Sequence, residues 1–187
     1  VNLGLATPDS SWTGVAYNAF KDEGNDAGGK KFFGEINLWL QNGASWTNEA
    51  WGEPPDAYFG EDFSESHLKR LVGGESADKA GHIFQKPGED EDSEGINIRV
   101  DDYKGFTNVY YGHKDEKPTD ILGGTFTVTK AQPGSGINLI TDSKGLNVDS
   151  SKAADKNLAS ATLNALANKL FYTAYKNGET NLTGKVE

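Results

Sequence analysis

The acidic run that begins at Asp90 has the spacing of a calcium-binding loop. Counted from Asp90, the residues Asp92, Glu94, Gly95 and Asp101 fall at positions 3, 5, 6 and 12 of that loop pattern. Oxygen ligands at alternate positions can surround one hard cation, and the glycine permits the sharp turn between them. Glu94 is one methylene longer than the expected aspartate, and Asp101 replaces the usual bidentate glutamate. The sequence therefore favours a solvated acidic turn, with a weak calcium site as the hypothesis to be tested.

Three aromatic residues offer a different chemistry, that of a flat apolar surface. Strand alternation places Trp39 opposite the apolar residues of its own segment, and Trp51 and Tyr58 follow it along the chain. Exposed aromatic rings stack on the faces of sugars or on the side chains of a partner. The competing interpretation, which the sequence favours, is that a long loop over residues 52–81 folds over these rings and buries them. Trp39, Trp51 and Tyr58 are thus the candidate ligand or partner surface.

No arrangement of residues points to a catalytic centre. The three histidines, His67, His82 and His113, lie far apart in the sequence and lack the spacing of a zinc site. The chain contains no nucleophile elbow and no phosphate-binding glycine pattern. With 28 acidic residues, carboxylates that fall near one another are expected by chance. We therefore predict no catalytic residues and no cofactor other than the hypothetical calcium ion.

Composition narrows the classes of partner. Lys and Arg number 18 against 28 Asp and Glu, which gives a formal net charge of −10. Because nucleic-acid binding depends on clustered cations, we expect no nucleic-acid partner. No apolar stretch has the length of a membrane span, so we expect no direct membrane insertion by this segment. Cysteine and methionine are both absent and the first residue is Val1, which favours a processed, secreted chain or a segment of a longer protein.

A recurring pair of strand-like runs indicates how the chain is organised. The runs at 96–100 and 107–111 come round again at 125–129 and 137–141. The first members begin 29 residues apart, at residues 96 and 125, and the second members begin 30 apart, at residues 107 and 137. A repeat of this length is typical of stacked coils that share one apolar core. We therefore predict one mainly β domain over residues 1–187, built as a stack of parallel strands, with an antiparallel β-sandwich as the alternative.

Two other segments complete this prediction. Residues 52–81 contain two adjacent prolines, glycines and many charges, which predicts a long loop with a helical turn near residues 66–71. Residues 152–176 are rich in alanine and carry leucines at helical spacing, which predicts one α-helix. We expect that helix to pack against the strand stack and cover an edge.

Several of these segments resemble the passenger regions of bacterial autotransporter-type surface proteins. The similar runs are residues 12–14 (WTG), 36–47 (INLWLQNGASWT) and 123–128 (GGTFTV). The resemblance implies a right-handed parallel β-helix, export to the cell surface and adhesion as the commonest task. It offers no catalytic residue at any position of this chain.

The expected function is therefore that of a non-enzymatic adhesion or scaffold segment of a secreted bacterial protein. Its location would be extracellular or at the bacterial cell surface, and its partners would be host or bacterial surface glycans or proteins. Two alternatives stay open at the level of sequence. One is a polysaccharide-active enzyme, a lyase or a glycosidase, on the same architecture. The other is a carbohydrate-binding module.

Overall fold

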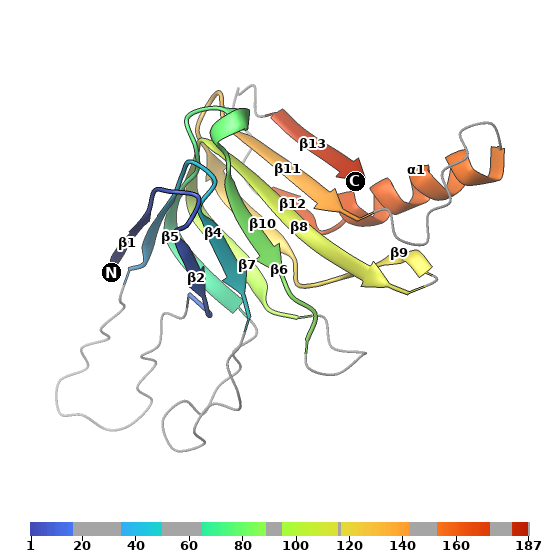
Figure 1. Cartoon of the computed structure of the whole chain (residues 1–187), viewed down its shortest axis with the longest axis horizontal. Coiled ribbons are helices and arrows are strands. Elements are labelled where there is room, and N and C mark those ends of the chain that lie inside the picture. The colour runs from blue at the N-terminus through green and yellow to red at the C-terminus, as the bar shows by residue number, and fades with distance from the viewer. Residues whose placement is uncertain are drawn as a thin grey trace, which may run out of the picture.

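Two ladders of parallel strands, stacked coil upon coil, form the protein (Figure 1). This computed structural model describes residues 1–16, 35–49, 65–88, 95–115, 117–142, 153–172 and 181–186, the last of these ranges as backbone only. Sheet A has the order β1 (Asn2–Leu5), β3 (Asn37–Leu40), β5 (Glu65–Val72), β7 (Asn97–Lys104), β10 (Phe126–Ala131) and β12 (Leu170–Tyr172). Sheet B has the order β2 (Ser11–Thr13), β4 (Ser45–Asn48), β6 (Gly81–Gln85), β8 (Phe106–Lys114), β11 (Gly136–Thr141) and β13 (Asn181–Val186). The remaining described elements are the 3-10 helix η1 (Ala77–Lys79), β9 (Lys117–Leu122) and α1 (Ala153–Ala167).

Each coil contributes one strand to sheet A and the next strand to sheet B. Every pairing along the two ladders is parallel, and among the named strands of the described chain only β9 pairs antiparallel, with β8. The predicted stack of parallel strands is therefore confirmed, and the alternative of an antiparallel sandwich is wrong. Because no single coil could bury its own apolar side, the stack supplies the core.

The observed strand pairing confirms one of the two spacings predicted from the sequence and contradicts the other. Ile137 pairs with Thr107, so the spacing predicted for the strands of sheet B is confirmed. In sheet A, Phe126 pairs with Ile98, whereas the predicted spacing would have set it beside Asn97. A shift by one residue would turn inward side chains outward. The observed register instead sets the buried residues Ile98 and Phe126 side by side in the core.

Sheet A bends at the same level in successive coils. In β5 the inward side chains are Leu68 and Leu71, three residues apart, where regular alternation would make the interval two. The same interval separates Val100 from Tyr103 in β7, and two consecutive residues between them point outward. An extra residue of this kind bends a strand in the manner of a β-bulge. Because the bends are stacked, each one also brings a pair of adjacent side chains to the outer face.

This bend explains why the loop predicted over residues 52–81 is wrong in its second half. Residues 65–72 form strand β5, and residues 77–79 form η1. The interval of three between Leu68 and Leu71 is close to the period of a helix, which is why the sequence suggested a helical turn there. The interval in fact belongs to an irregular strand in sheet A. Residues 52–64 lie outside the described residues.

The predicted C-terminal helix is confirmed but is shorter than expected. It ends at Ala167, and residues 170–172 form strand β12, which pairs in parallel with β10. The aromatic residues of this strand favour extended backbone, and pairing with the edge of sheet A stabilises it. Within α1, Leu166 is fully buried, whereas Leu163 remains 37% exposed. Figure 1 places α1 beside β9, β11 and β13, at the far side of the stack from β1 and β2.

The first coils are aligned by tryptophan stacking. The rings of Trp12 and Trp46 are 5.3 Å apart and nearly parallel, at 9°. Trp46 is fully buried and donates its indole N–H to the carbonyl of Gly14 at 2.9 Å. A turn at Asn42 and Gly43 precedes β4, and both residues have positive φ, at 53° and 80°. The pair suits this turn because asparagine and glycine tolerate that conformation better than other residues.

A buried polar network joins successive coils at one end of sheet B. The side-chain amide of Asn48 donates to the Gln85 side chain at 2.8 Å and to the carbonyl of Ile96 at 2.7 Å. Its carbonyl oxygen accepts from the Ser66 hydroxyl at 2.7 Å. Asn48, Ser66 and Gln85 are at most 3% exposed, so these three side chains lie away from water. One side chain therefore satisfies polar groups from neighbouring coils.

We predict that replacing Asn48 with alanine will destabilise the fold. The change leaves buried donors and acceptors without partners, at a cost of about 1–3 kcal/mol. Urea unfolding and thermal melting measure the loss. The matched control is Asn37→Ala, because the hydrogen bond that the Asn37 side chain makes to Asn2, at 2.8 Å, is exposed. We expect the control to change the unfolding free energy by less than about 0.5 kcal/mol. Equal losses in the two variants would contradict a special role for the buried network.

Candidate binding surface on the outer face of sheet B

Parallel register lines up side chains from successive coils on the outer face of sheet B. In β6 and β8 the inward side chains are Ile83 and Val109, so their neighbours in sequence point outward. The backbone register sets Phe84 beside Tyr110, and Tyr110 beside Ile140 of β11. The result is a row of large apolar side chains that runs along the stack, outside the core.

Two aromatic rings in this row are stacked on each other. The ring centroids of Phe84 and Tyr110 are 4.8 Å apart and their planes differ by 18°. Phe84 is 37% exposed, which is high for a phenylalanine in the middle of a sheet. The Tyr110 hydroxyl lies 3.1 Å from Nδ1 of His82, on the same face of β6. Tyr110 is thus held by a ring contact on one side and by a hydrogen bond at its hydroxyl.

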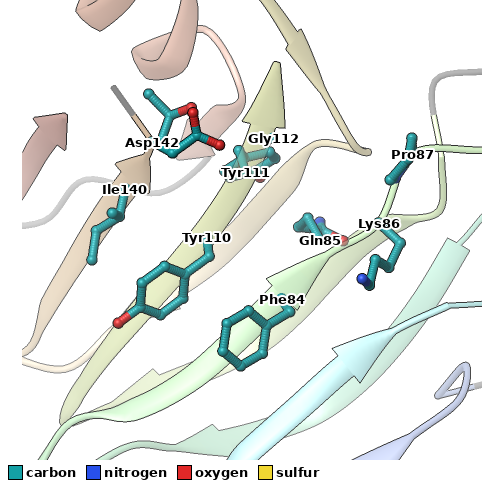
Figure 2. A pocket seen from close by; sticks show the side chains of 10 residues that line it. Phe84, Gln85, Lys86, Pro87, Tyr110, Tyr111, Gly112, Ile140 and Asp142 are labelled. Carbon is teal, nitrogen blue, oxygen red and sulfur yellow. The ribbon is translucent and has the colours of Figure 1, made fainter. Parts of the chain in front are cut away.

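The rings lie at a surface hollow of about 330 Å³, which we call the aromatic hollow (Figure 2). Its lining includes Phe84, Lys86, Tyr110, Gly112, Ile140 and Asp142. Lys86 and Asp142 are its charged residues, one of each sign, and Figure 2 shows them on different sides of the two rings. The aromatic hollow thus combines an apolar surface with a donor and an acceptor at its rim.

Burial shifts the pKa values of two residues near the aromatic hollow, His82 and Tyr111. Burial lowers the pKa of His82 below its ordinary value of 6.5, so the ring is neutral at pH 7. A neutral imidazole has one acceptor nitrogen, and Nδ1 of His82 can therefore accept the hydroxyl proton of Tyr110. Burial also raises the pKa of Tyr111 far above its ordinary value, with the Gln85 side chain offsetting part of that effect. Tyr111 is therefore a neutral core residue at physiological pH.

Asp142, at the rim of the aromatic hollow, contacts a buried histidine. Nε2 of His113 lies 2.9 Å from a carboxylate oxygen of Asp142. The His113 side chain is only 2% exposed, while that of Asp142 is 59% exposed. The imidazole Nδ1 donates in turn to the carbonyl of Lys114 at 3.0 Å. One oxygen of the carboxylate therefore lies against the buried imidazole, while most of the Asp142 side chain faces solvent.

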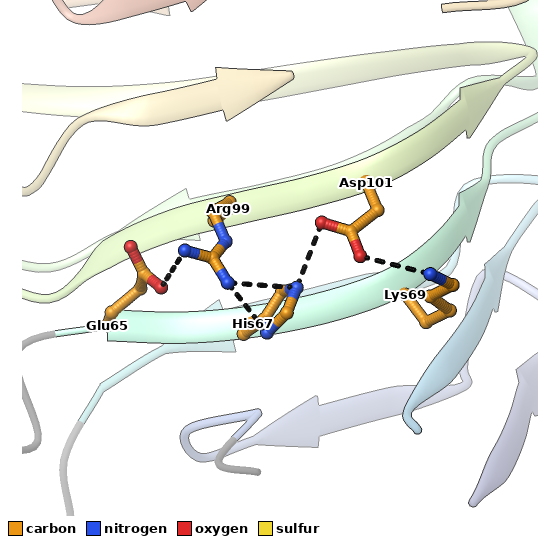
Figure 3. A network of polar contacts seen from close by, with 5 residues as sticks. All are labelled: Glu65, His67, Lys69, Arg99 and Asp101. Atoms are coloured by element: carbon orange, nitrogen blue, oxygen red, sulfur yellow. Dashed lines mark hydrogen bonds and ion pairs between the residues drawn. The ribbon is translucent and has the colours of Figure 1, made fainter. Parts of the chain in front are cut away.

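Between β5 and β7, the outer face of sheet A carries a set of ion pairs (Figure 3). Arg99 of β7 lies 3.5 Å from Glu65 and 3.2 Å from Nδ1 of His67, both in β5. Nε2 of His67 and the ammonium of Lys69 approach Asp101 at 3.0 Å and 3.4 Å. Arg99 also lies 3.4 Å from Nε2 of His67. Because an ionised carboxylate can only accept, Nε2 is the nitrogen that donates to Asp101. We call this set the ionic ladder.

One of the four predicted calcium ligands, Asp101, belongs to the ionic ladder. Partial burial raises the pKa of Asp101, but the hydrogen bonds and charges of His67 and Lys69 together outweigh it and lower the pKa overall. Asp101 is therefore ionised and already paired with cationic or donor groups across β5 and β7. The other three predicted ligands, Asp90, Asp92 and Glu94, lie outside the described residues. Within the described chain, no group of three or more histidines and carboxylates is placed to hold a metal ion.

The predicted aromatic surface has one member in the described chain. Trp39 lies on the outer face of β3 in sheet A, partly exposed, beside Gly4 and Val72 of the neighbouring strands. Trp51 and Tyr58 lie outside the described residues. Trp39 belongs to the opposite sheet from Phe84 and Tyr110, so it is no part of the aromatic hollow.

Sequence reasoning missed the aromatic hollow. Alternation over residues 107–111 does place Tyr110 outward, opposite Val109. The link to Phe84 depends on the pairing of β6 with β8, whose interval along the chain is shorter than that of the recognised repeat. The signal was therefore present within each strand but absent from the spacing between them.

None of the helices in the described part of the chain has the length and apolar character of a membrane span.

We predict that His82 makes stability depend on pH. Because its folded pKa lies below the ordinary value of 6.5, the unfolded chain binds the proton more readily. The unfolding free energy should therefore fall as the pH drops below about 6.5, until the folded-state pKa is reached. Urea denaturation at pH values from about 7.5 down to about 5, which span the ordinary histidine pKa of 6.5, measures the slope. In the variant His82→Asn, whose amide can still accept from Tyr110, the slope should be smaller. Identical slopes would show that His82 does not contribute.

No known family model, curated protein or solved structure matches this chain. The resemblance to autotransporter-type passengers thus depends on the short sequence motifs alone. What the chain does must be inferred from its own geometry.

Proposed function

We propose that this chain is a non-enzymatic binding segment of a secreted bacterial surface protein, of the autotransporter passenger type. In this proposal the solenoid is a rigid scaffold that displays outer sheet faces to host or bacterial surface molecules. The location would be the cell surface or the extracellular space. The proposal combines the short motifs of the sequence with the architecture and surface of the described chain.

The observation that carries the proposal is that inward residues form the apolar core, whereas outward residues form rows on the surface. Apolar residues of both ladders fill one continuous interior, from Leu38 and Trp46 at one end to Leu139 towards the other. The outward residues do not contribute to this apolar interior. Rows of such residues along a solenoid make an extended surface, which is how repeat proteins typically bind partners.

The two faces differ in a way that suits a display scaffold. On sheet A the ionic ladder pairs its charges with each other across neighbouring coils, so these groups support the stack. On sheet B the row contains Phe84, which stays 37% exposed. An exposed ring on a rigid sheet is a feature of binding surfaces. Because Phe84 also stacks on Tyr110 and lines the aromatic hollow, we assign ligand contact to sheet B.

The enzymatic alternative fits the aromatic hollow less well. Glycoside hydrolysis uses two carboxylic acids that flank the scissile bond. In the described lining of the aromatic hollow there is one carboxylate, Asp142, and His113 already contacts it. Tyr111, the nearby phenol, remains protonated at physiological pH because burial raises its pKa. This chemistry suits binding better than bond cleavage.

We predict that beads coated with the chain will adhere to bacterial or epithelial cell surfaces. The control is an unrelated acidic protein of similar size, which tests whether net charge alone causes retention. In parallel, incubation with a panel of acidic and neutral polysaccharides should release no reducing ends or unsaturated products. Adhesion above the control without product release supports the proposal. Product release that increases with the concentration of the chain, or retention no greater than the control on every surface, would overturn it.

A further inference from the structure

We propose that the aromatic hollow on sheet B binds a neutral sugar ring of a surface glycan. This inference rests on the proposed function, which it deepens by naming the site and the chemical class of the ligand. It is carried by the stacked pair Phe84 and Tyr110, by the charges at the rim and by the size of the hollow.

The two rings supply the apolar part of such a site. A pyranose ring presents carbon-bound hydrogens on one or both faces, and these pack against an aromatic face. Phe84 and Tyr110, with centroids 4.8 Å apart and planes within 18°, are stacked face against face with an offset. Together they form one rigid aromatic platform that spans two coils, and Phe84 lies at the end of it, beside Thr47 of β4. The partly exposed ring of Phe84 is the accessible part of this platform. Aromatic residues contribute large, rigid contact area of this kind at binding sites.

The platform is held in place before any ligand arrives. Both residues are within parallel strands, and the backbone register of β6 and β8 fixes their separation. The hydrogen bond between the Tyr110 hydroxyl and His82, at 3.1 Å, fixes the ring orientation as well. Since little side-chain freedom remains to be lost, binding costs less conformational entropy.

The rim supplies the polar part. Sugar hydroxyl groups both donate and accept hydrogen bonds, and they need partners of both kinds. Lys86 offers an ammonium donor and Asp142 a carboxylate acceptor, on different sides of the rings (Figure 2). These two charges are opposite, so the lining has no excess of either sign. The whole chain carries −10, which disfavours a polyanionic ligand and favours a neutral sugar over a uronic or sialic acid.

The size of the hollow decides between a sugar and a protein partner. Its volume of about 330 Å³ is at the lower end of the range for small-molecule sites and suits one or two sugar rings. A stable protein interface buries roughly 1,200 Å² or more, far beyond what one hollow of this size provides. A ring at the end of a glycan chain therefore fits the aromatic hollow better than a folded partner.

The test is binding of the intact chain to neutral oligosaccharides of glucose, galactose and mannose, and to sialylated and uronate-containing ones, by glycan array and calorimetry. We expect binding to at least one neutral class and weaker binding to its acidic counterpart. Phe84→Ala and Tyr110→Ala should each weaken binding by about tenfold or more. Phe84→Leu keeps an apolar side chain for folding but removes the flat face, so it should also weaken binding.

The matched control is Phe171→Ala. Phe171 is a 51% exposed aromatic residue of β12 in sheet A, away from the aromatic hollow. Its replacement should leave glycan affinity within about twofold, as expected for a surface position outside the binding site. Circular dichroism and melting temperature establish that each variant is folded.

Three results would overturn the inference, and each of them can be told apart from a failure of the proposed function. Glycan binding that survives Phe84→Leu and Tyr110→Ala would place the sugar elsewhere, and stronger binding to acidic glycans would contradict the neutral ligand. Adhesion to cells without binding to any glycan would defeat the inference but not the proposed function. Conversely, glycan binding followed by release of cleaved products would support the site and defeat the non-enzymatic function.

Discussion

Hydrogen bonding between parallel strands of successive coils determines the direction of every side chain in this solenoid. Once a residue is paired with its counterpart in the coil below, both point inward or both point outward. Leu68, Val100 and Val128 are paired in this way across β5, β7 and β10, and all three are fully buried. The core is therefore a set of rows that run along the stack. A strand that slipped by one residue would expose its part of every row.

The pairing of parallel strands also determines which side chains meet on each outer face. At the bends in β5 and β7 of sheet A, two adjacent residues point outward, Lys69 with Arg70 and Asp101 with Asp102. Opposite charges thereby meet across neighbouring strands, as between Arg70 and Asp102 at 3.4 Å. Such partly exposed pairs add little stability individually, but they disfavour a wrong register. Sheet B keeps its regular alternation in this region, which lets aromatic rings line up.

Sequence patterns revealed those parts of the fold that depend on local alternation. The alternation around Trp39, the strand-like runs at 96–100 and 107–111 and the helix that begins near residue 153 all follow from the order of neighbouring residues. Strand β5 could not be recognised, because its bend gives it the spacing of a helix. Strand β12 was assigned to the helix, because its pairing with β10 joins segments that are far apart in the sequence. Long-range pairing overrides local preference in both cases.

The aromatic hollow was harder to predict for a related reason. Coils in this chain differ in length, since the chain takes fewer residues to pass from Phe84 to its partner Tyr110 than from Tyr110 to its next partner, Ile140. A fixed period therefore aligns some strands and misses others, and Phe84 fell outside the recognised repeat. Trp39 was found because its own strand alternates clearly, but its sequence neighbours do not reveal which residues lie beside it in space. Assembling a site across coils requires the register, which single-strand patterns do not contain.

Unequal coil lengths have a consequence for how this protein can change during evolution. Insertions between strands shift residue numbers but leave the rows intact, since the strands re-pair at the same level. A substitution at Val100 instead alters the space open to Leu68 and Val128, which lie in other coils but are its direct partners in the row. Homologous chains should therefore show correlated changes between distant positions within one row, together with free variation in the length of the connecting segments.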